Sequence, residues 1–233
     1  MDDDTPQLSD SVAIVLAAGA GVRMGAGMPK ALMPLAGRPL LSWSLLALAE
    51  AGVADVVLVA PPGDERPTAM ALGEVMRDCT VVPGGANRGR SLAAGLAAGA
   101  ETAEIILVHD AARPLLSADL VRRAVAGLSD GDGAVVAAPA TDTVKIADDD
   151  LQIVGTADRS RQWHAQPPQV FRGPAFRAAV DTAATDGFLD EATDCSAIVE
   201  RAGGRVRIVP NTAPNLKVTT PADLALAEQL LRG

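Results

Sequence analysis

The stretch LAAGAGVRMGAGMPK (16–30) overlaps the end of the apolar run VAIVLAA (12–18), so a buried strand leads directly into a glycine-rich loop that carries Arg23 and Lys30. In an open α/β sheet, ligands bind beyond the carboxyl ends of the strands. The glycines of the loop would expose backbone N–H groups to phosphate oxygens without a Cβ in the way. Two cations at the same place add the charge, which favours a phosphate-binding loop.

The loop differs from both common nucleotide motifs. A dinucleotide fingerprint requires G-x-G-x-x-G and an acidic residue at the end of the second strand. Here the third glycine is one place late, and the second strand ends in Val59 and Ala60. A P-loop would need Gly-Lys followed by Ser or Thr, which this loop lacks.

The rest of the chain alternates strand-like and helix-like segments. Continuous apolarity, typical of buried parallel strands, occurs at 12–18, 55–60, 79–83, 104–110 and 133–139. Helix-like segments bounded by Gly, Pro, Ser or Asp lie between them at 39–51, 65–77, 88–99 and 117–128. Two further helices near 174–185 and 194–202, a strand at 205–210 and a helix at 220–232 close the chain. This order predicts an α/β, doubly wound, mostly parallel sheet of the Rossmann-like kind.

The segment 141–171 breaks the alternation. DTVKI and LQIVGTADR read as two short strands around the turn ADDD (147–150), which predicts an inserted β-hairpin arm and its return. The residues alone leave open whether this is an arm that packs outside the core or a plain surface hairpin. No internal repeat or low-complexity linker interrupts 1–233, so we expect a single domain, with 1–10 as a disordered lead-in.

Composition excludes several classes of protein. The formal charge of −9 disfavours a nucleic-acid surface. The longest apolar candidate for a membrane span, 40–60, is broken by Glu50, Gly52 and Asp55. The acidic start MDDDTPQLSD has no basic n-region or apolar h-region, so we expect a cytoplasmic protein. Cys79 and Cys195 are too few for a disulfide framework and are expected to be reduced thiols.

The first loop, followed by PLAGRPLL, resembles the signature of nucleotidyltransferases that activate sugars and related alcohols. Further segments resemble the methylerythritol-phosphate cytidylyltransferase family in order and spacing, and together they cover nearly the whole chain after residue 11: GGANRGRSLAAGL (84–96), HDAARPLL (109–116), TDTVK (141–145), TADRSRQWHAQPPQVF (156–171), ATDCSAIVE (192–200) and NLKVTTPADL (215–224). The resemblance implies transfer of CMP from CTP to 2-C-methyl-D-erythritol 4-phosphate, a sugar-alcohol phosphate, with release of pyrophosphate.

The resemblance also implies roles for individual residues. The nucleotide would be bound by Ala17, Ala18, Gly19, Gly21, Gly85, Arg88 and Ser91, and the acceptor by Asp110, Ala111, Arg113, Thr143 and Thr193. The catalytic cations would be Arg23, Lys30, Arg159 and Lys217. Arg159 on the arm would reach the site of a second subunit, which implies a homodimer.

Several of these residues have simpler explanations. Asp110 could cap the turn after its strand, and His109 is expected to be a structural histidine at the strand end. Arg88 and Arg90 could be solvated helix charges, and we prefer that interpretation for Arg90. Thr143 could be an ordinary strand residue and Thr193 a helix N-cap.

The chain departs from the family in two places near the expected acceptor pocket. Cys195-Ser196 follows Thr193-Asp194 directly, where the family usually has an acidic residue and then Ala-Ser. Pro167 stands where many relatives have Thr or Ser before the Pro-Gln pair.

The chemistry requires charge compensation more than a base. A phosphate monoester has a second pKa of about 6, so the acceptor is nucleophilic at neutral pH. Mg²⁺ or another divalent cation would bridge the phosphates, and Asp110 is the carboxylate that we nominate as its ligand.

Three alternative functions remain: a ribitol 5-phosphate cytidylyltransferase, a molybdopterin nucleotidyltransferase and a non-catalytic nucleotide-binding regulator. HDAARP and the Thr-Asp segment disfavour the molybdopterin nucleotidyltransferase.

Overall fold

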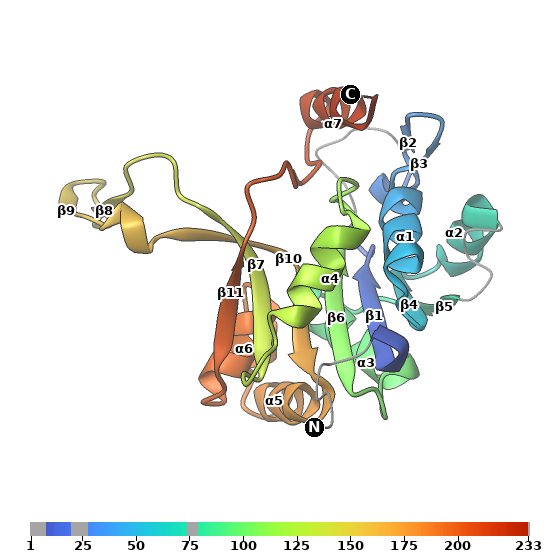
Figure 1. Cartoon of the computed structure of the whole chain (residues 1–233), viewed down its shortest axis with the longest axis horizontal. Coiled ribbons are helices and arrows are strands. Elements are labelled where there is room, and N and C mark those ends of the chain that lie inside the picture. The colour runs from blue at the N-terminus through green and yellow to red at the C-terminus, as the bar shows by residue number, and fades with distance from the viewer. Residues whose placement is uncertain (1–7, 20–27, 74–78, 233) are drawn as a thin grey trace.

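A central sheet organises the molecule, and within residues 8–19, 28–73 and 79–232, which the computed structural model describes, it has seven strands (Figure 1). The order across the sheet is β11-β7-β10-β6-β1-β4-β5. Neighbouring strands are parallel except at β10, which is antiparallel to both β6 and β7. The bounds are β1 Ser11–Leu16, β4 Asp55–Ala60, β5 Cys79–Pro83, β6 Ile105–Asp110, β7 Gly133–Pro139, β10 Trp163–Arg172 and β11 Val206–Pro210. The predicted doubly wound, mostly parallel sheet is confirmed.

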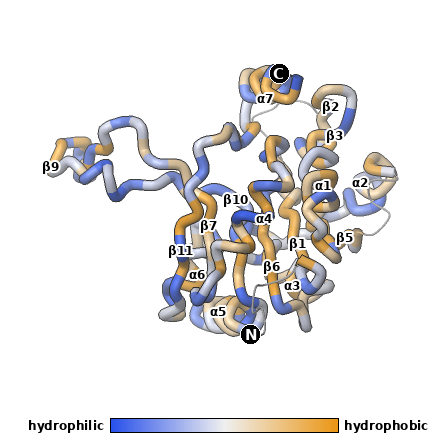
Figure 2. Tube along the Cα trace, viewed as in Figure 1, coloured by the Kyte–Doolittle hydropathy of each residue, from blue (hydrophilic) through white to orange (hydrophobic). Residues whose placement is uncertain are grey.

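The parallel strands are continuously apolar because both faces of the sheet are covered by helices. In β1, Ala13 and Val15 enter one apolar core with α1 (Leu40–Ala51) and α4 (Ala118–Ala126). Val12 and Ile14 point to the other face and enter a second core with α3 (Arg88–Gly99), α5 (Gly173–Thr185) and α6 (Cys195–Arg201). Successive strand residues alternate between the faces, so a strand buried on both sides needs apolar residues at every position. Figure 2 shows the hydrophobic segments gathered in these central strands.

β10 is missing from the strands predicted above, although it lies inside the sheet between β6 and β7. The reason is the pair Pro167 and Pro168, since proline cannot donate to a strand ladder and argues against a central strand. The structure accommodates both prolines where the pairing with β7 shifts register, between Gln166 and Gln169. The return from the arm is therefore an ordered strand of the core.

Helix ends differ from the sequence expectation by a few residues. α2 covers Glu65–Leu72 rather than 65–77, and residues 74–78 lie outside the described part of the chain. α4 begins after Ser117, whose side chain accepts the N–H of Leu120. The N-cap of α6 is Asp194 rather than Thr193, because the Asp194 carboxylate accepts the N–H of Ala197 at 3.0 Å. α7 occupies Pro221–Arg232, with proline at its start as expected.

A small substructure lies next to the entry of α1. β2 (Pro34–Leu35) and β3 (Arg38–Pro39) form a two-stranded sheet, preceded by the short 3-10 helix η3 (Lys30–Leu32). A small apolar cluster joins Leu35 of β2, Val218 of the C-terminal segment and Ala227 of α7. This cluster packs α7 and the segment around Val218 against β2 and the start of α1.

The start of the chain is partly ordered. Leu8–Asp10, which we expect to belong to a disordered lead-in, form a 3-10 helix, and Leu8 packs against the core on the α1 and α4 side of the sheet. The apolar side chain of Leu8 gains from this burial, which the acidic composition of the segment obscures. Residues 1–7 lie outside the described part.

The predicted hairpin is present and projects from the body of the molecule (Figure 1). It consists of β8 (Lys145–Ala147) and β9 (Ile153–Thr156), paired antiparallel. Its apolar side chains are open to solvent in the single chain: Leu151 is 85% exposed, Ile153 65% and Val154 63%.

Among the helices that the structure describes, none has the length and apolarity needed to cross a bilayer.

Candidate active site

A cavity of about 440 Å³ opens at the carboxyl ends of β1 and β6. β1 is the point where the order of strands reverses, because β4 and β5 follow on one side of it and β6 on the other. In such sheets the crevice at this reversal is the usual ligand site. The structure brings together there most of the residues that the sequence nominates, namely Ala17, Ala18, Gly19, Lys30, Gly85, Arg88, Ser91, Asp110, Ala111 and Lys217.

The loop between β5 and α3 forms one wall of this cavity. The Gly85 N–H donates to Ser91 Oγ at 3.1 Å, and Ser91 Oγ donates to the Asn87 carbonyl at 2.8 Å. At Gly84, an added Cβ would lie 2.4 Å from the Cβ of Ala18, so only glycine lets this loop approach the residues that follow β1. The Asn87 side chain caps α3 by accepting the Arg90 N–H at 2.8 Å. Arg88 is thereby fixed in the first turn of α3.

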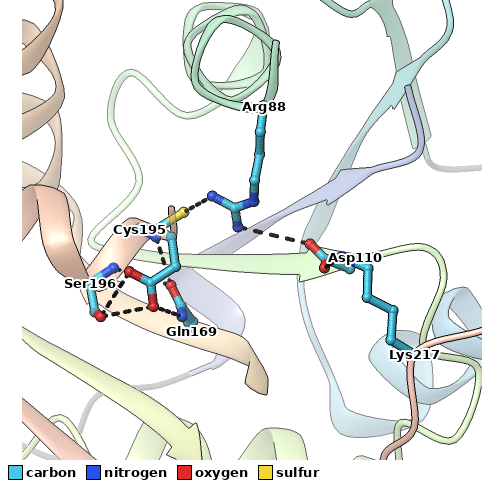
Figure 3. A network of polar contacts seen from close by, with 7 residues as sticks. Arg88, Asp110, Gln169, Cys195, Ser196 and Lys217 are labelled. Atoms are coloured by element: carbon cyan, nitrogen blue, oxygen red, sulfur yellow. Dashed lines mark hydrogen bonds and ion pairs between the residues drawn. The ribbon is translucent and has the colours of Figure 1, made fainter. Parts of the chain in front are cut away.

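Three charged side chains form a continuous polar contact across the cavity (Figure 3). Lys217 Nζ donates to Asp110 Oδ2 at 2.9 Å, and Arg88 Nη2 lies 3.8 Å from Asp110 Oδ1. Burial opposes ionisation of Asp110, but Lys217 and Arg88 outweigh it and hold the pKa of Asp110 below its ordinary value. Asp110 is therefore an ionised carboxylate shared by two cations, and its side chain does not cap the following turn.

Lys30 lines the cavity from η3. Its Nζ donates to the Val218 carbonyl at 3.1 Å, and the Val218 N–H donates to the Ala112 carbonyl at 2.8 Å. These two hydrogen bonds tie the segment that carries Lys217 to the turn after β6 and to the end of the glycine-rich loop. Lys30 and Lys217 are 187 positions apart in sequence, yet tertiary contacts place both on the same cavity.

His109 is a structural residue, as expected. It is fully buried at the end of β6, where its Nε2 lies 3.1 Å from Ser44 Oγ of α1. Burial lowers the pKa of His109 from 6.5 to about 4, so the imidazole is neutral at physiological pH. A neutral histidine held between α1 and β6 is not placed to act as a base.

The buried imidazole leads to a prediction about acid stability. Between pH 6.5 and 4 the unfolded chain binds a proton at His109 that the folded chain does not, so the free energy of unfolding should fall as the pH drops, by about 3 kcal/mol in all. Denaturant unfolding at a series of pH values would measure this slope. In His109→Gln the slope should flatten, whereas the exposed control His164→Gln should keep it; an unchanged slope in His109→Gln would contradict the assignment.

Some nominated residues lie elsewhere. Arg113 is partly buried beside the cavity, where its Nη1 donates to the Asn215 carbonyl. Thr143 and Arg159 are exposed on the arm, and Arg159 Nη1 donates to the Thr141 carbonyl at 2.9 Å. Thr193 is exposed just before the N-cap of α6. None of these four belongs to the described lining of the cavity in a single chain.

Arg23 and Gly21 fall within 20–27, outside the described residues, so their predicted roles stay predictions. Conversely, the site expected from the sequence does not include Cys195 or Gln169. The sulfur of Cys195 accepts a hydrogen bond from Arg88, and Gln169 accepts the backbone N–H of Cys195. Their position in the quoted segments PPQVF and ATDCS was the available signal, but a buried amide and a buried thiol carry no local pattern that distinguishes them from core residues.

The donor set of the cavity suits a cation that arrives with phosphates. Asp110 is the carboxylate among the lining residues that the structure describes, and no group of three or more His, Cys, Asp or Glu side chains gathers anywhere in that part of the chain. Mg²⁺ commonly uses one or two carboxylates and completes its shell with substrate phosphates and water. A single carboxylate facing a cationic cavity fits that mode and not an all-protein metal centre.

Comparison with known proteins agrees with this geometry. The family model described as 2-C-methyl-D-erythritol 4-phosphate cytidylyltransferase matches residues 11–233. Relatives of that name from Saccharopolyspora erythraea and Symbiobacterium thermophilum are 43% and 41% identical over 94% of this chain, and the matches cover 98% and 91% of their lengths.

Solved structures resemble the whole fold. A 4-diphosphocytidyl-2C-methyl-D-erythritol synthase from Anaerococcus prevotii has a TM-score of 0.84 at 27% identity, covering 96% of this chain and 98% of that one. A 2-C-methyl-D-erythritol 4-phosphate cytidylyltransferase from Thermus thermophilus has a TM-score of 0.77 at 32% identity, covering 96% of this chain and all of that one. With the family model matching from β1 to the C-terminus, this chain belongs to the 2-C-methyl-D-erythritol 4-phosphate cytidylyltransferase family.

Proposed function

We propose that this protein is a cytidylyltransferase that transfers CMP from CTP to 2-C-methyl-D-erythritol 4-phosphate and releases pyrophosphate, a step in isoprenoid precursor synthesis. The observation that carries the proposal is the cavity at the strand reversal, where Arg88 and Lys217 contact a single carboxylate, Asp110, and Lys30 lines the same cavity. Family membership over residues 11–233 supplies the identity of the reaction.

The reaction needs no general base. A phosphate oxygen of the acceptor forms a bond to the α-phosphorus of CTP, while the bond from that phosphorus to the bridging oxygen of the β-phosphate breaks, and pyrophosphate leaves with the electron pair. The acceptor phosphate is largely dianionic at neutral pH and brings its own nucleophilic oxygen. The neutral, buried state of His109 agrees with chemistry in which no side chain removes a proton.

The protein must instead compensate charge, because two polyanions approach each other and more negative charge develops on the leaving pyrophosphate. Asp110 cancels one of the two cations that it contacts, so Arg88, Lys217 and Asp110 together carry a net positive charge. Lys30 adds another cation at the end of the loop that follows β1. We assign Lys30 to the triphosphate and Lys217 to the acceptor phosphate, with Arg23 as a second triphosphate ligand.

Mg²⁺ would supply Lewis-acid polarisation of the phosphates, with Asp110 as its protein ligand. The base and ribose would bind near Ala17, Ala18, Gly19 and Gly85, all of which line the cavity. Arg113, Thr143 and Thr193 would contact the acceptor, and the first of these lies beside the cavity at Asn215.

A homodimer through the arm completes the proposal. The hairpin of one chain leaves Ile146, Leu151, Ile153 and Val154 more than half exposed, and an apolar surface of this kind is typical of a protein interface. Arg159 lies on the same arm and away from the cavity of its own chain. Packing of the arm on a second subunit would bury these side chains and bring Arg159 to the partner's cavity.

Pyrophosphate release is the experiment that tests the function. CTP and Mg²⁺ would be offered with methylerythritol 4-phosphate or ribitol 5-phosphate in parallel, with UTP and GTP as nucleotide controls. Activity that prefers CTP and methylerythritol phosphate is expected. Preference for ribitol phosphate would move the enzyme to polyol activation, and no release with either acceptor, despite CTP binding, would favour a nucleotide-binding regulator.

A further inference from the structure

The guanidinium of Arg88 is held from two sides at the cavity wall. Arg88 Nη1 donates to Cys195 Sγ at 3.3 Å, while Nη2 lies 3.8 Å from Asp110 Oδ1 (Figure 3). Arg88 comes from α3, Cys195 from α6 and Asp110 from β6, so the guanidinium joins three elements of the fold. Cys195 is fully buried, and its thiol is therefore a fixed part of the wall behind Arg88.

The backbone of Cys195 is itself locked in place. Gln169 of β10 is 3% exposed, and its Oε1 accepts the N–H of Cys195 at 3.0 Å and that of Ser196 at 3.2 Å. Gln169 Nε2 donates to Asp194 Oδ2 at 2.9 Å, so one amide side chain satisfies three groups at the start of α6. The inserted strand β10 thus fixes where the sulfur of Cys195 lies relative to the cavity.

The chemistry of the thiol decides what this contact does. Burial raises the pKa of Cys195 above its ordinary value despite the nearby Arg88, so the group is a neutral thiol at physiological pH. A neutral sulfur accepts a hydrogen bond without cancelling the charge of its donor. Asp110, the carboxylate within 4 Å of Arg88 in the described structure, also pairs with Lys217 at 2.9 Å. Positive charge is left for an anionic ligand.

We propose that Cys195 is a positioning residue for nucleotide binding: its sulfur orients the Arg88 guanidinium toward the cavity while leaving the charge of Arg88 available to CTP. This inference rests on the proposed nucleotide site and adds to it a buried residue that lies outside the described lining of the cavity. An acidic side chain at position 195 would orient Arg88 as well, but it would also neutralise it.

The test compares variants that change only the sulfur. Cys195→Ala keeps the backbone N–H that Gln169 binds and removes the acceptor of Arg88. We expect a rise of about threefold to tenfold in the KM and in the Kd for CTP with little change in kcat, which is the fold-change for losing one hydrogen bond of ordinary strength. Cys195→Ser retains an acceptor and should restore most of the affinity. Cys79→Ala, at the amino end of β5, is the matched control and should bind CTP as the parent protein does.

A double-mutant cycle separates positioning from general packing. If Cys195 acts through Arg88, adding Cys195→Ala to Arg88→Met should raise the KM for CTP no further than Arg88→Met alone. Thermal unfolding of each variant establishes that the compared proteins are folded. The proposal would be overturned if the double variant raised the KM for CTP by the product of the two single effects. It would also be overturned by an unchanged KM in folded Cys195→Ala, or by a Cys195→Ser protein that binds CTP as weakly as Cys195→Ala does.

Calorimetric titration of the parent protein with CTP and Mg²⁺ distinguishes a failure of the proposed function from a failure of the role of Cys195. A parent protein that does not bind CTP would remove the proposed function itself. A parent protein that binds CTP as tightly as a folded Cys195→Ala variant would leave the function standing and remove only the role of Cys195.

Discussion

Replacing Lys30 with methionine is expected to lower kcat by about 10²- to 10³-fold, the usual loss when one preorganised group that stabilises transition-state charge is removed. Lys30 lines the cavity, and the substitution also removes the hydrogen bond that its Nζ donates to the Val218 carbonyl. Methionine keeps most of the aliphatic side chain, so the change in the free energy of unfolding should be small beside the loss in rate. Steady-state pyrophosphate release and thermal unfolding measure the two effects.

The matched control for Lys30→Met is Arg205→Met. Arg205 is an exposed cation just before β11, at the opposite end of the parallel strands, where it pairs with Asp130. Its loss changes the net charge by the same amount and should leave kcat unaltered. Activity of the Lys30 variant equal to that of the Arg205 variant would remove Lys30 from the catalytic machinery.

Mixing two inactive variants, Lys30→Met and Arg159→Ala, is expected to restore activity if each arm serves the partner's cavity. Random exchange of subunits makes half of the dimers mixed, and one of the two sites in a mixed dimer then has both Lys30 and Arg159. Roughly a quarter of all sites would therefore be intact. The physical reason is that Arg159 and Lys30 of one chain do not share a cavity in the described structure.

Lys30→Met mixed with Lys217→Met is the control for this recovery, because both lysines line the cavity of the same chain and every site would lack one of them. Subunits that carry two different labels would demonstrate that exchange takes place. If exchange is complete and the first mixture stays inactive, Arg159 does not act across the interface.

The sequence alone determined the class of the fold and the place of the site. Runs of apolar residues predict strands buried on both faces, and the glycine-rich loop after the first of them marks the edge where ligands bind. Both signals are local, since they depend on neighbouring residues in one segment. For the same reason the hairpin around 147–150 could be located from its turn and the two short strand-like segments beside it.

Tertiary structure decided which charges face the cavity. Arg88 and Arg90 lie two positions apart in one helix, yet Arg88 enters the cavity while Arg90 makes two hydrogen bonds of 2.7 Å with Asp190 on another element. Arg90 is thus an exposed helix charge outside the cavity, as expected, and it also forms an ion pair with Asp190. No periodicity within α3 could assign these partners, because Asp190 is 100 residues away.

The place of β10 and the contact between Arg88 and Cys195 were likewise decided by tertiary structure. Two prolines obscure the strand in the sequence, and its insertion between β6 and β7 depends on pairing with segments far along the chain. The sulfur and the guanidinium are 107 positions apart and meet where Gln169 of that strand binds the start of α6. Local patterns encode secondary structure, whereas the approach of two buried polar groups depends on how the whole sheet is ordered.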